Sequence, residues 1–308
     1  MKKQILKYSV LITLFFFFGS FAFSSTVYFS PKIGLKNGIE REYLFTGSHK
    51  LSQLDWNVQN QIDIGFETDF FVENLYFGFD FSVGLYNFSG FMEDRDWKNS
   101  SSDLTNYSWH NLVVKEDIDF SFDIGIIFPW EWKTTKSQFK KNHGQENYIS
   151  AFFQFNLKSS TYDGVQGWYD YKEPNMTGTF EDYGKVISYN PSIVSLLLGF
   201  GANINVYKNF SVRTGVSTSF LSSGICIDNH WIPGDKWVDS VAGAFFLKGF
   251  LDLSYNFNNK NALVLGGKIN YLPPIFGECY VNNILSSLIG GFSSFSYEFY
   301  LSYRIRIL

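Results

Sequence analysis

Two short segments that lie far apart in the sequence each carry a pair of ionisable side chains, two residues apart. Asp94 and Asp96 form the first pair, and Asp228 and His230 form the second. Residues i and i+2 of an extended strand point to the same face, so each segment would present its two groups side by side. The elements that bring the segments together must come from the rest of the chain.

The residue types favour hydrolysis by an activated water molecule. A carboxylate beside a histidine fixes the tautomer of the imidazole and stabilises its protonated form, so Asp228 and His230 could act as a general base. Asp94 and Asp96, held close as like charges, would raise one pKa and could share a proton or hold a water molecule. The spacing alone is also typical of solvated loop charges, and the four side chains could by type ligate a divalent metal.

The elements that could position these pairs are strands with one strongly apolar face. Phe77, Phe79 and Phe81 alternate with polar or small residues in the stretch 75–86, and a period of two is the pattern of a strand. The same alternation recurs at 112–126, 149–158, 194–205, 212–220, 247–256 and 297–307, and more weakly at 27–35, 50–66 and 263–271. The total is about ten strands, an even number as in bacterial outer-membrane barrels.

Alternation alone does not separate a soluble sandwich from a barrel. A basic start at Lys2 and Lys3, followed by an apolar run, predicts a secretory signal peptide over 1–24 and leaves 25–308 as a single domain. Aromatic residues make up 20% of the chain and end many strands, as in interfacial girdles. We therefore expect an all-β fold, an antiparallel transmembrane β-barrel of the outer membrane. Several strands exceed the ~10 residues that cross hydrocarbon, so the barrel should extend above the membrane on the extracellular side.

The lengths of the connections predict which end of the barrel carries the two pairs. Short connections, expected in the periplasm, lie at 71–74, 207–209 and 256–260. Long connections, expected outside the cell, lie around Thr46 and at 94–106, 160–189, 228–239 and 273–290. Counting strands places one pair at the end of the third strand and the other at the end of the seventh, so both would face each other across an extracellular cleft. The Lys-rich insert at 130–147 falls where a short periplasmic turn is expected, and the pattern does not explain it.

Other candidate groups are weaker. Ser108 and His110, expected in the second long loop, lack a placed acid and are more typical of polar loop content than of a catalytic triad. His143 is interpreted as solvated. Cys226 and Cys279 could pair in an oxidising compartment, and the sequence leaves this open. The net charge of -4 gives no reason to expect a nucleic acid as partner.

Several separate motifs resemble the omptin family of outer-membrane endopeptidases. Residues 40–43, Glu-Arg-Glu-Tyr, resemble the family's Glu-Arg-x-Tyr, and residues 50–56, Lys-Leu-Ser-Gln-Leu-Asp-Trp, are close to its Lys-x-Ser-Gln-Leu-Asp-Trp. Residues 92–97 resemble Met-x-Asp-x-Asp-Trp, and residues 228–233 resemble Asp-x-His-x-x-Pro. The order and spacing of the motifs agree along nearly the whole mature chain.

The resemblance implies a peptide hydrolase of the aspartyl type, in which Asp228 and His230 activate the water. Asp94 and Asp96 would hold that water and help to stabilise the oxyanion. Catalysis would need no metal and no cofactor, although an outer-membrane glycolipid could be required for activity.

The resemblance also implies a pocket for a basic substrate side chain. Glu40 would line this pocket together with Met92 and Cys226. The family usually carries an acidic residue at the position of Cys226. With one carboxylate missing, the preference for Arg or Lys should be weakened or altered, because a cationic side chain loses charge-assisted hydrogen bonds.

The expected partners are peptide or protein substrates at the cell surface and outer-membrane lipid, with the chain acting as a monomer. The alternative is a catalytically inactive barrel of the same ancestry that serves as an adhesin or a structural protein. A passive pore fits less well, because a narrow barrel filled with charged and tyrosine side chains leaves little open lumen.

Overall fold

The computed structural model describes residues 25–98, 103–130, 147–172, 175–207, 209–243 and 245–308. The predicted signal peptide lies outside the described residues, as does most of the Lys-rich insert with His143.

The described residues form thirteen β-strands. The strands are β1 (Ser25–Thr46), β2 (His49–Val72), β3 (Leu75–Gly84), β4 (Asn87–Asp96), β5 (Asn106–Pro129), β6 (Tyr148–Tyr171), β7 (Met176–Thr179), β8 (Lys185–Tyr207), β9 (Phe210–His230), β10 (Asp235–Gly243), β11 (Leu247–Asn256), β12 (Asn261–Val281) and β13 (Ile284–Arg306). Within the described ranges no helix is long and apolar enough to cross a membrane.

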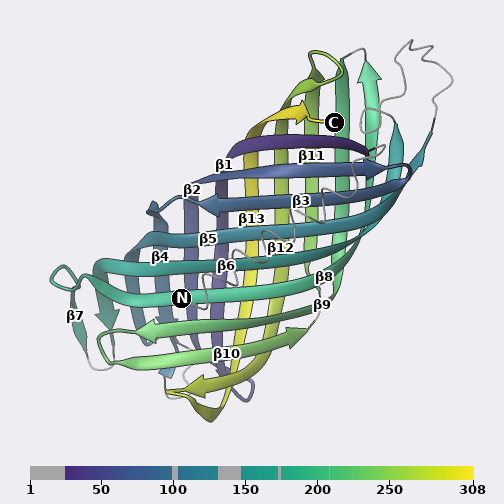
Figure 1. Cartoon of the computed structure of the whole chain (residues 1–308). Coiled ribbons are helices and arrows are strands. Elements are labelled where there is room, and N and C mark those ends of the chain that lie inside the picture. The colour runs from purple at the N-terminus through teal and green to yellow at the C-terminus, as the bar shows by residue number, and fades with distance from the viewer. Residues whose placement is uncertain (1–24, 99–102, 131–146, 173–174, 208, 244) are drawn as a thin grey trace, which may run out of the picture.

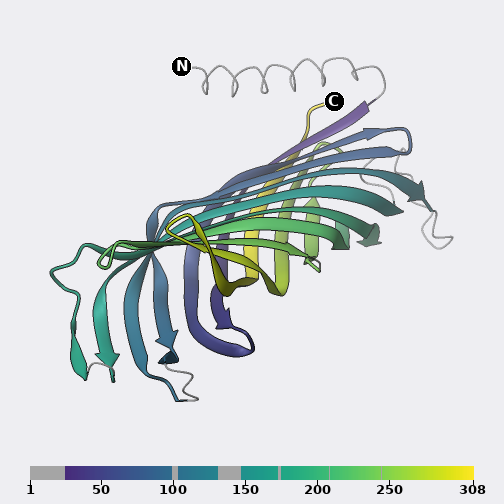
Figure 2. The same cartoon turned by 90° about the horizontal axis from the view of Figure 1, so that it is seen from below.

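The strands pair antiparallel in a single sheet that closes on itself, because β1 pairs with both β2 and β13. β3 and β4 lie end to end between β2 and β5, and together they count as one strand of the wall. β11 and β10 lie end to end between β9 and β12 in the same way, and the short β7 pairs only with β6. The wall is therefore a ring of ten strands, and the predicted barrel is confirmed. Figures 1 and 2 show the long strands running the length of the molecule, with the C-terminus at one end and β7 at the other.

Several of the predicted long loops are wrong, because those segments continue as strands. β1 and β2 meet at the two residues Gly47 and Ser48, and β12 and β13 meet at Asn282 and Asn283. Most of 160–189 belongs to β6, β7 and β8. We call the end of the barrel that carries these turns, together with the ends of β4 and β9, the rim. A part of a strand that does not face lipid needs no row of apolar residues, so the period of two is a weaker signal near the rim.

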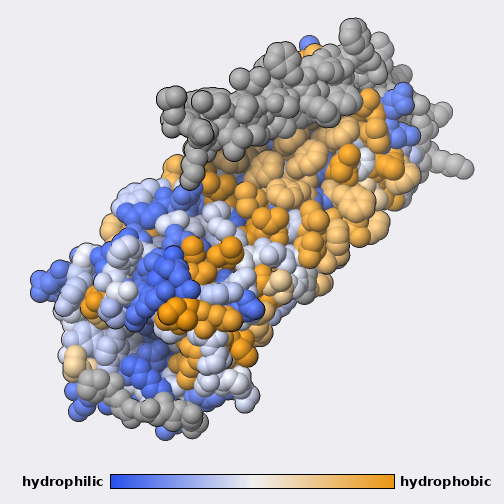
Figure 3. Space-filling model, turned by 60° about the horizontal axis from the view of Figure 1, so that its bottom comes forward, coloured by the Kyte–Doolittle hydropathy of each residue, from blue (hydrophilic) through white to orange (hydrophobic). Residues whose placement is uncertain are grey.

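The apolar face of the alternation forms a belt on the outside of the barrel. On β13, Phe299 is 64% exposed and Leu301 is 48% exposed, while Tyr300 between them is 3% exposed. On the face that Figure 3 shows, apolar surface in orange covers much of the half that carries the C-terminus, and the surface toward the rim is mostly hydrophilic. The belt matches the outer surface that a barrel presents to lipid.

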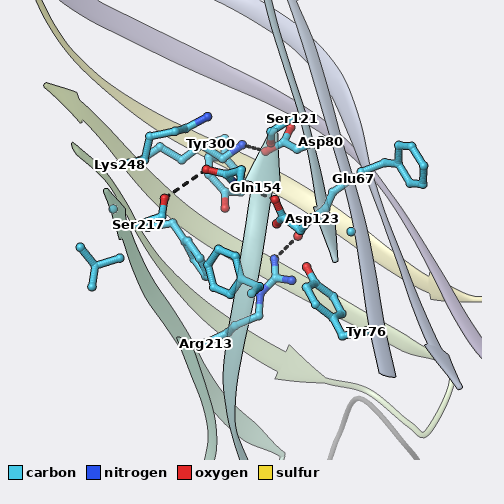
Figure 4. Close-up of a pocket in the computed structure, with 17 residues that line it drawn as sticks. Glu67, Tyr76, Asp80, Ser121, Asp123, Gln154, Arg213, Ser217, Lys248 and Tyr300 are labelled. Carbon is cyan, nitrogen blue, oxygen red and sulfur yellow. Dashed lines mark hydrogen bonds and ion pairs between the residues drawn. The ribbon is translucent and has the colours of Figure 1, made fainter. Parts of the chain in front are cut away.

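The polar face fills the interior of the same half with paired charges. Arg213 binds Asp69 at 3.0 Å and Asp252 at 2.8 Å, and it also pairs with Glu67. Figure 4 shows Arg213 and Glu67 beside Tyr300 and Gln154 around a pocket inside the barrel. The cavity between them is about 60 Å³, room for only a few water molecules. Pairing is what makes buried charges tolerable, so this layer is a plug.

A layer of aromatic side chains lies between the charged plug and the rim. The ring of Trp56 stacks on Tyr189 with centroids 5.4 Å apart and on Tyr162 with centroids 6.1 Å apart. Phe292 packs against Tyr189, and Met92 belongs to the same buried cluster. This layer separates the rim from the charged plug in the half that carries the C-terminus.

Candidate active site

The inner face of β4 carries the first ionisable pair at the rim. Asp94 lies across from Leu54 of β2 and Ser108 of β5. Asp96 is two residues further along, at the last position of the strand, so both carboxylates point into the barrel. The third-strand position expected for this pair is the one observed, because β3 and β4 together form the third wall position.

The intervening residue, Arg95, points outward and fastens β4 to its neighbour. Its guanidinium binds Asp55 of β2 at 2.6 Å and Glu93 at 2.6 Å. Asp55 also accepts a hydrogen bond from Gln53 at 2.7 Å. Two members of the 50–56 motif, Gln53 and Asp55, thus act on the outer face, where they fix the strand whose inner face carries the acids.

The inner face of β9 carries the second pair. His230 Nε2 lies 2.5 Å from Asp228 Oδ2. Asp228 is 2% exposed, while the side chain of His230 is 26% exposed, so the histidine is the member that reaches solvent. The strand ends at His230, and its carbonyl accepts a hydrogen bond from the amide of Gly234 in the turn that follows. Gly234 has a φ of 80°, a conformation that favours glycine.

The two pairs act on each other across the barrel. Burial and the adjacent Asp96 raise the pKa of Asp94 to about 8, while His230 opposes that rise. Burial lowers the pKa of His230, but its partner Asp228 and the carboxylates of the opposite pair outweigh that effect and raise it to about 9. Each pair therefore lies within electrostatic reach of the other, as four groups of one site require.

Two buried oxygens of this site have no hydrogen-bond partner, Oδ1 of Asp94 and Oδ1 of Asp228. Unpaired buried acceptors are costly, so they are positions where a water molecule or a substrate N–H group would gain stability. Among the described residues, no group of three or more His, Cys, Asp or Glu side chains is arranged to hold a metal ion.

The three residues predicted to line the pocket lie on inner faces, deeper in the barrel than the two pairs: Glu40 on β1, Met92 on β4 and Cys226 on β9. Glu40 is 3% exposed and forms an ion pair with Lys158 of β6. Met92 is fully buried, and Cys226 is 1% exposed. The structure thus brings these three residues into the buried layer under the site, and the carboxylate of Glu40 already has a cationic partner.

The two cysteines are free and buried. Both lie directly across from Asp239 of β10, Cys226 on β9 and Cys279 on β12. Two strand spacings, roughly 10 Å, therefore separate them. This is more than a disulfide spans, which answers the question that the sequence left open.

Ser108 and His110 lie in β5, not in a loop as predicted. Ser108 Oγ is 2.9 Å from His110 Nε2, and His110 Nδ1 is 2.5 Å from the carbonyl of Gln166. Burial lowers the pKa of His110 to about 4, so the ring is neutral and its Nδ1–H donates to that carbonyl. A backbone carbonyl stands where a triad would have its acid, so the arrangement ties β5 to β6.

Sequence reasoning missed two acids that adjoin the site. Glu42 on β1 is 7% exposed, and Asp239 on β10 is 1% exposed. The spacing of two from Glu40 could have placed Glu42 on the same inner face. Nothing in the sequence pairs residue 239 with residue 226, because the segment 228–239 was taken as a loop.

Comparisons with known proteins agree with this fold and with the sequence motifs. A family model described as "Omptin family" matches residues 24–279. The crystal structure of the outer membrane protease OmpT from Escherichia coli matches with a TM-score of 0.80 at 16% sequence identity, covering 93% of this chain and 99% of that chain.

Two other solved structures are much less similar. The translocator domain of the autotransporter NalP from Neisseria meningitidis has a TM-score of 0.34 at 10% identity, covering 90% of this chain and 89% of its own. Neisserial surface protein A has a TM-score of 0.28 at 8% identity, covering 90% and 98%. No curated protein sequence matches this chain.

Proposed function

The chain belongs to the omptin family, and from this premise we propose that it is an outer-membrane endopeptidase that hydrolyses peptide bonds with a water molecule activated by Asp228 and His230. The observation that carries the proposal is the 2.5 Å contact between these two side chains, with Asp94 and Asp96 in electrostatic reach on the opposite wall. The OmpT-like barrel supports the outer-membrane location.

Proton transfer begins at the imidazole. Neutral His230 takes a proton from the water while the water oxygen attacks the carbonyl carbon of the substrate. Asp228 stabilises the imidazolium that forms. The tetrahedral intermediate then collapses, the C–N bond breaks, and the same proton passes to the leaving amine. No covalent enzyme intermediate is needed.

The opposite pair stabilises the intermediate. With a pKa of about 8, Asp94 keeps its proton at neutral pH. A protonated carboxyl can donate a hydrogen bond to the oxyanion, whereas an ionised one cannot. Burial raises the pKa of Asp96 as well, while a hydrogen bond from Ser52 opposes that rise. In its ionised form Asp96 can accept a hydrogen bond from the attacking water.

The proposal also covers the surroundings of the enzyme. The hydrophilic rim projects from the apolar belt (Figure 3), so we place the site outside the cell, where it would cleave peptides or surface proteins. A monomer is the expected state, because the ring is closed within one chain. Dependence on an outer-membrane glycolipid stays a prediction.

The test is a map of the cuts that the refolded protein makes in a mixed peptide library, read by mass spectrometry beside a His230→Ala variant. The matched control is His49→Ala, which removes an imidazole at the β1–β2 turn whose hydrogen bond is to the carbonyl of Trp97. We expect the parent and His49→Ala to cut the same bonds and His230→Ala to cut none of them.

An outcome without cuts, from barrels shown to be folded and tested with and without outer-membrane lipid, would refute the proposal. It would favour the alternative, an inactive surface barrel that acts as an adhesin or a structural protein. Cuts that persist in His230→Ala would show that another group, or a contaminating protease, performs the hydrolysis.

A further inference from the structure

We propose that Glu42 and Asp239 form the subsite that binds a basic side chain of the peptide, in place of Glu40 and residue 226. The inference rests on the proposed function and concerns the substrate class of the same site. The ligand group that this subsite would prefer is the guanidinium of an Arg side chain.

Asp239 is a buried acid without a cationic partner, and the thiol of Cys279 is its hydrogen-bonding neighbour. It is 1% exposed, and neither of its carboxylate oxygens makes a hydrogen bond of normal geometry. Its carboxylate lies over Gly290 of β13, where an added Cβ would come within 2.0 Å of Oδ1. The absence of a side chain at residue 290 therefore leaves the space that this carboxylate occupies.

Glu42 approaches the same place from the other side of β13. It lies directly across from Phe292 on that strand, two residues from Gly290, and its Oε2 is buried without a partner. Glu42 interacts electrostatically with Asp239, Asp228 and Asp94. The two carboxyl groups therefore converge on β13, within electrostatic reach of the water-activating pair.

The pair has the chemistry of a site for a cation. Three buried oxygens need donors, and a guanidinium offers five N–H groups in a rigid fork. The neighbours of Asp239 are acids and thiols, namely Asp228 and Cys226 on β9, Cys279 on β12 and Glu42 on β1. Burial and the nearby carboxylates raise the pKa of Glu42, and burial with Asp228 raises that of Asp239 to about 7, although the thiol of Cys279 lowers it.

Glu40 differs because it already has a cation, although its Oε2 is also buried without a hydrogen-bond partner. Its ion pair with Lys158 provides the cation, and Lys158 is held in addition by Ser294 at 3.0 Å. A buried pair that is already formed resists exchange, because removing one partner leaves an uncompensated charge. The charge that the family usually places at residue 226 is supplied here by the adjacent residue of the next strand, since Asp239 lies directly across from Cys226.

The test compares two peptides that differ only in Arg or citrulline beside the cleaved bond, because citrulline has the same size without the charge. We expect the parent to show a kcat/KM at least about tenfold higher for the Arg peptide. Asp239→Asn and Glu42→Gln should each bring that ratio toward one, mainly by slowing cleavage of the Arg peptide. Glu278→Gln is the matched control, since it removes an exposed acid beside Cys279 on the outer face.

A parent that cleaves both peptides equally, or an Arg preference that survives in Asp239→Asn but is lost in Glu40→Gln, would overturn the inference. Binding of the same peptides to His230→Ala, followed by fluorescence anisotropy, separates the two proposals. Tighter binding of the Arg peptide that depends on Asp239 supports the subsite even if no peptide is cleaved. Equal binding of both peptides would contradict it.

Discussion

The pKa values of the side chains in the site are set by the other members of the site. The pKa of Asp94 is about 8 because of burial and Asp96, and that of His230 is about 9 because three carboxylates outweigh burial. Since the groups interact strongly, the titration steps belong to the cluster and not to single residues. The acid and the base of the proposed reaction are thus set by the same mutual contacts.

This coupling predicts a bell-shaped pH dependence of kcat/KM with a maximum between about 8 and 9. As the pH falls, His230 becomes protonated and can no longer accept a proton from water. As the pH rises, Asp94 ionises and loses the proton that it donates to the oxyanion. The profile should be measured with the citrulline peptide, whose side chain carries no charge.

The variant Asp94→Asn provides the control for this profile. An amide donates a hydrogen bond at every pH, so the alkaline limb should disappear while the acidic limb remains. A maximum below pH 7 in the parent would contradict the assignment of His230 as the base.

At the scale of elements, the position of β4 depends on contacts made outside the barrel. Asp55 of β2 binds Arg95 at 2.6 Å and Arg41 at 3.3 Å. Tyr107 of β5 donates a hydrogen bond to Glu93 at 2.7 Å. These contacts tie β4 to both neighbouring strands, and the acids on its inner face inherit that position.

We therefore expect Asp55→Asn to act as the loss of a positioning residue. Removal of the charge should lower kcat by about ten- to a hundredfold, because small displacements of catalytic groups are costly, while KM changes less than about twofold. The pH profile should keep its shape. Asp163→Asn is a matched control, since Asp163 pairs with Lys115 and Lys185 on the outside of other strands. A rise in KM with unchanged kcat would argue for a role in substrate binding instead.

The predictable elements are the ones that face lipid. The alternation of Phe77, Phe79 and Phe81 identifies β3 because hydrocarbon requires every second side chain to be apolar. The same constraint ends near the rim. The segment 273–290 contains two prolines and two glycines, which are typical of loops, yet it continues β12 and β13 around the turn at Asn282 and Asn283. Backbone pairing with neighbours, which a single sequence does not show, holds these strands.

The site was predictable to the extent that it follows the period of a strand and the family motifs. Residues 94, 96, 228 and 230 share inner faces by that rule. The pairing of Glu40 with Lys158 was not predictable, because 118 positions separate the two residues and only the closed ring brings β1 and β6 into contact through the interior. The convergence of Glu42 and Asp239 depends on the same closure.

At the scale of the whole molecule, ion pairs stabilise the charged plug in the half that carries the C-terminus. Arg213 is the single cation that hydrogen-bonds Asp69, Asp252 and Glu67 within the described residues. We expect Arg213→Met to lower the free energy of unfolding by about 3–5 kcal/mol, because three carboxylates lose the cation that they hydrogen-bond. Denaturant unfolding of the refolded barrel would measure the change. Arg306→Met, at the C-terminal end of β13, should lower the free energy of unfolding by less than about 1 kcal/mol. Equal losses in both variants would refute this explanation.

The layers of the interior also decide how the barrel behaves toward ions. A path along the axis would have to pass the charged plug around Arg213 and then the stacked rings of Trp56, Tyr162 and Tyr189. The cavity in the plug, about 60 Å³, holds only a few water molecules. We expect the parent to show no stable open conductance in planar bilayers. A variant that replaces Trp56 by Ala should also stay closed, because the charged plug is intact. Stable channels in the parent would restore the passive pore as an explanation of the fold, and channels in Trp56→Ala alone would show that the aromatic layer is the true barrier.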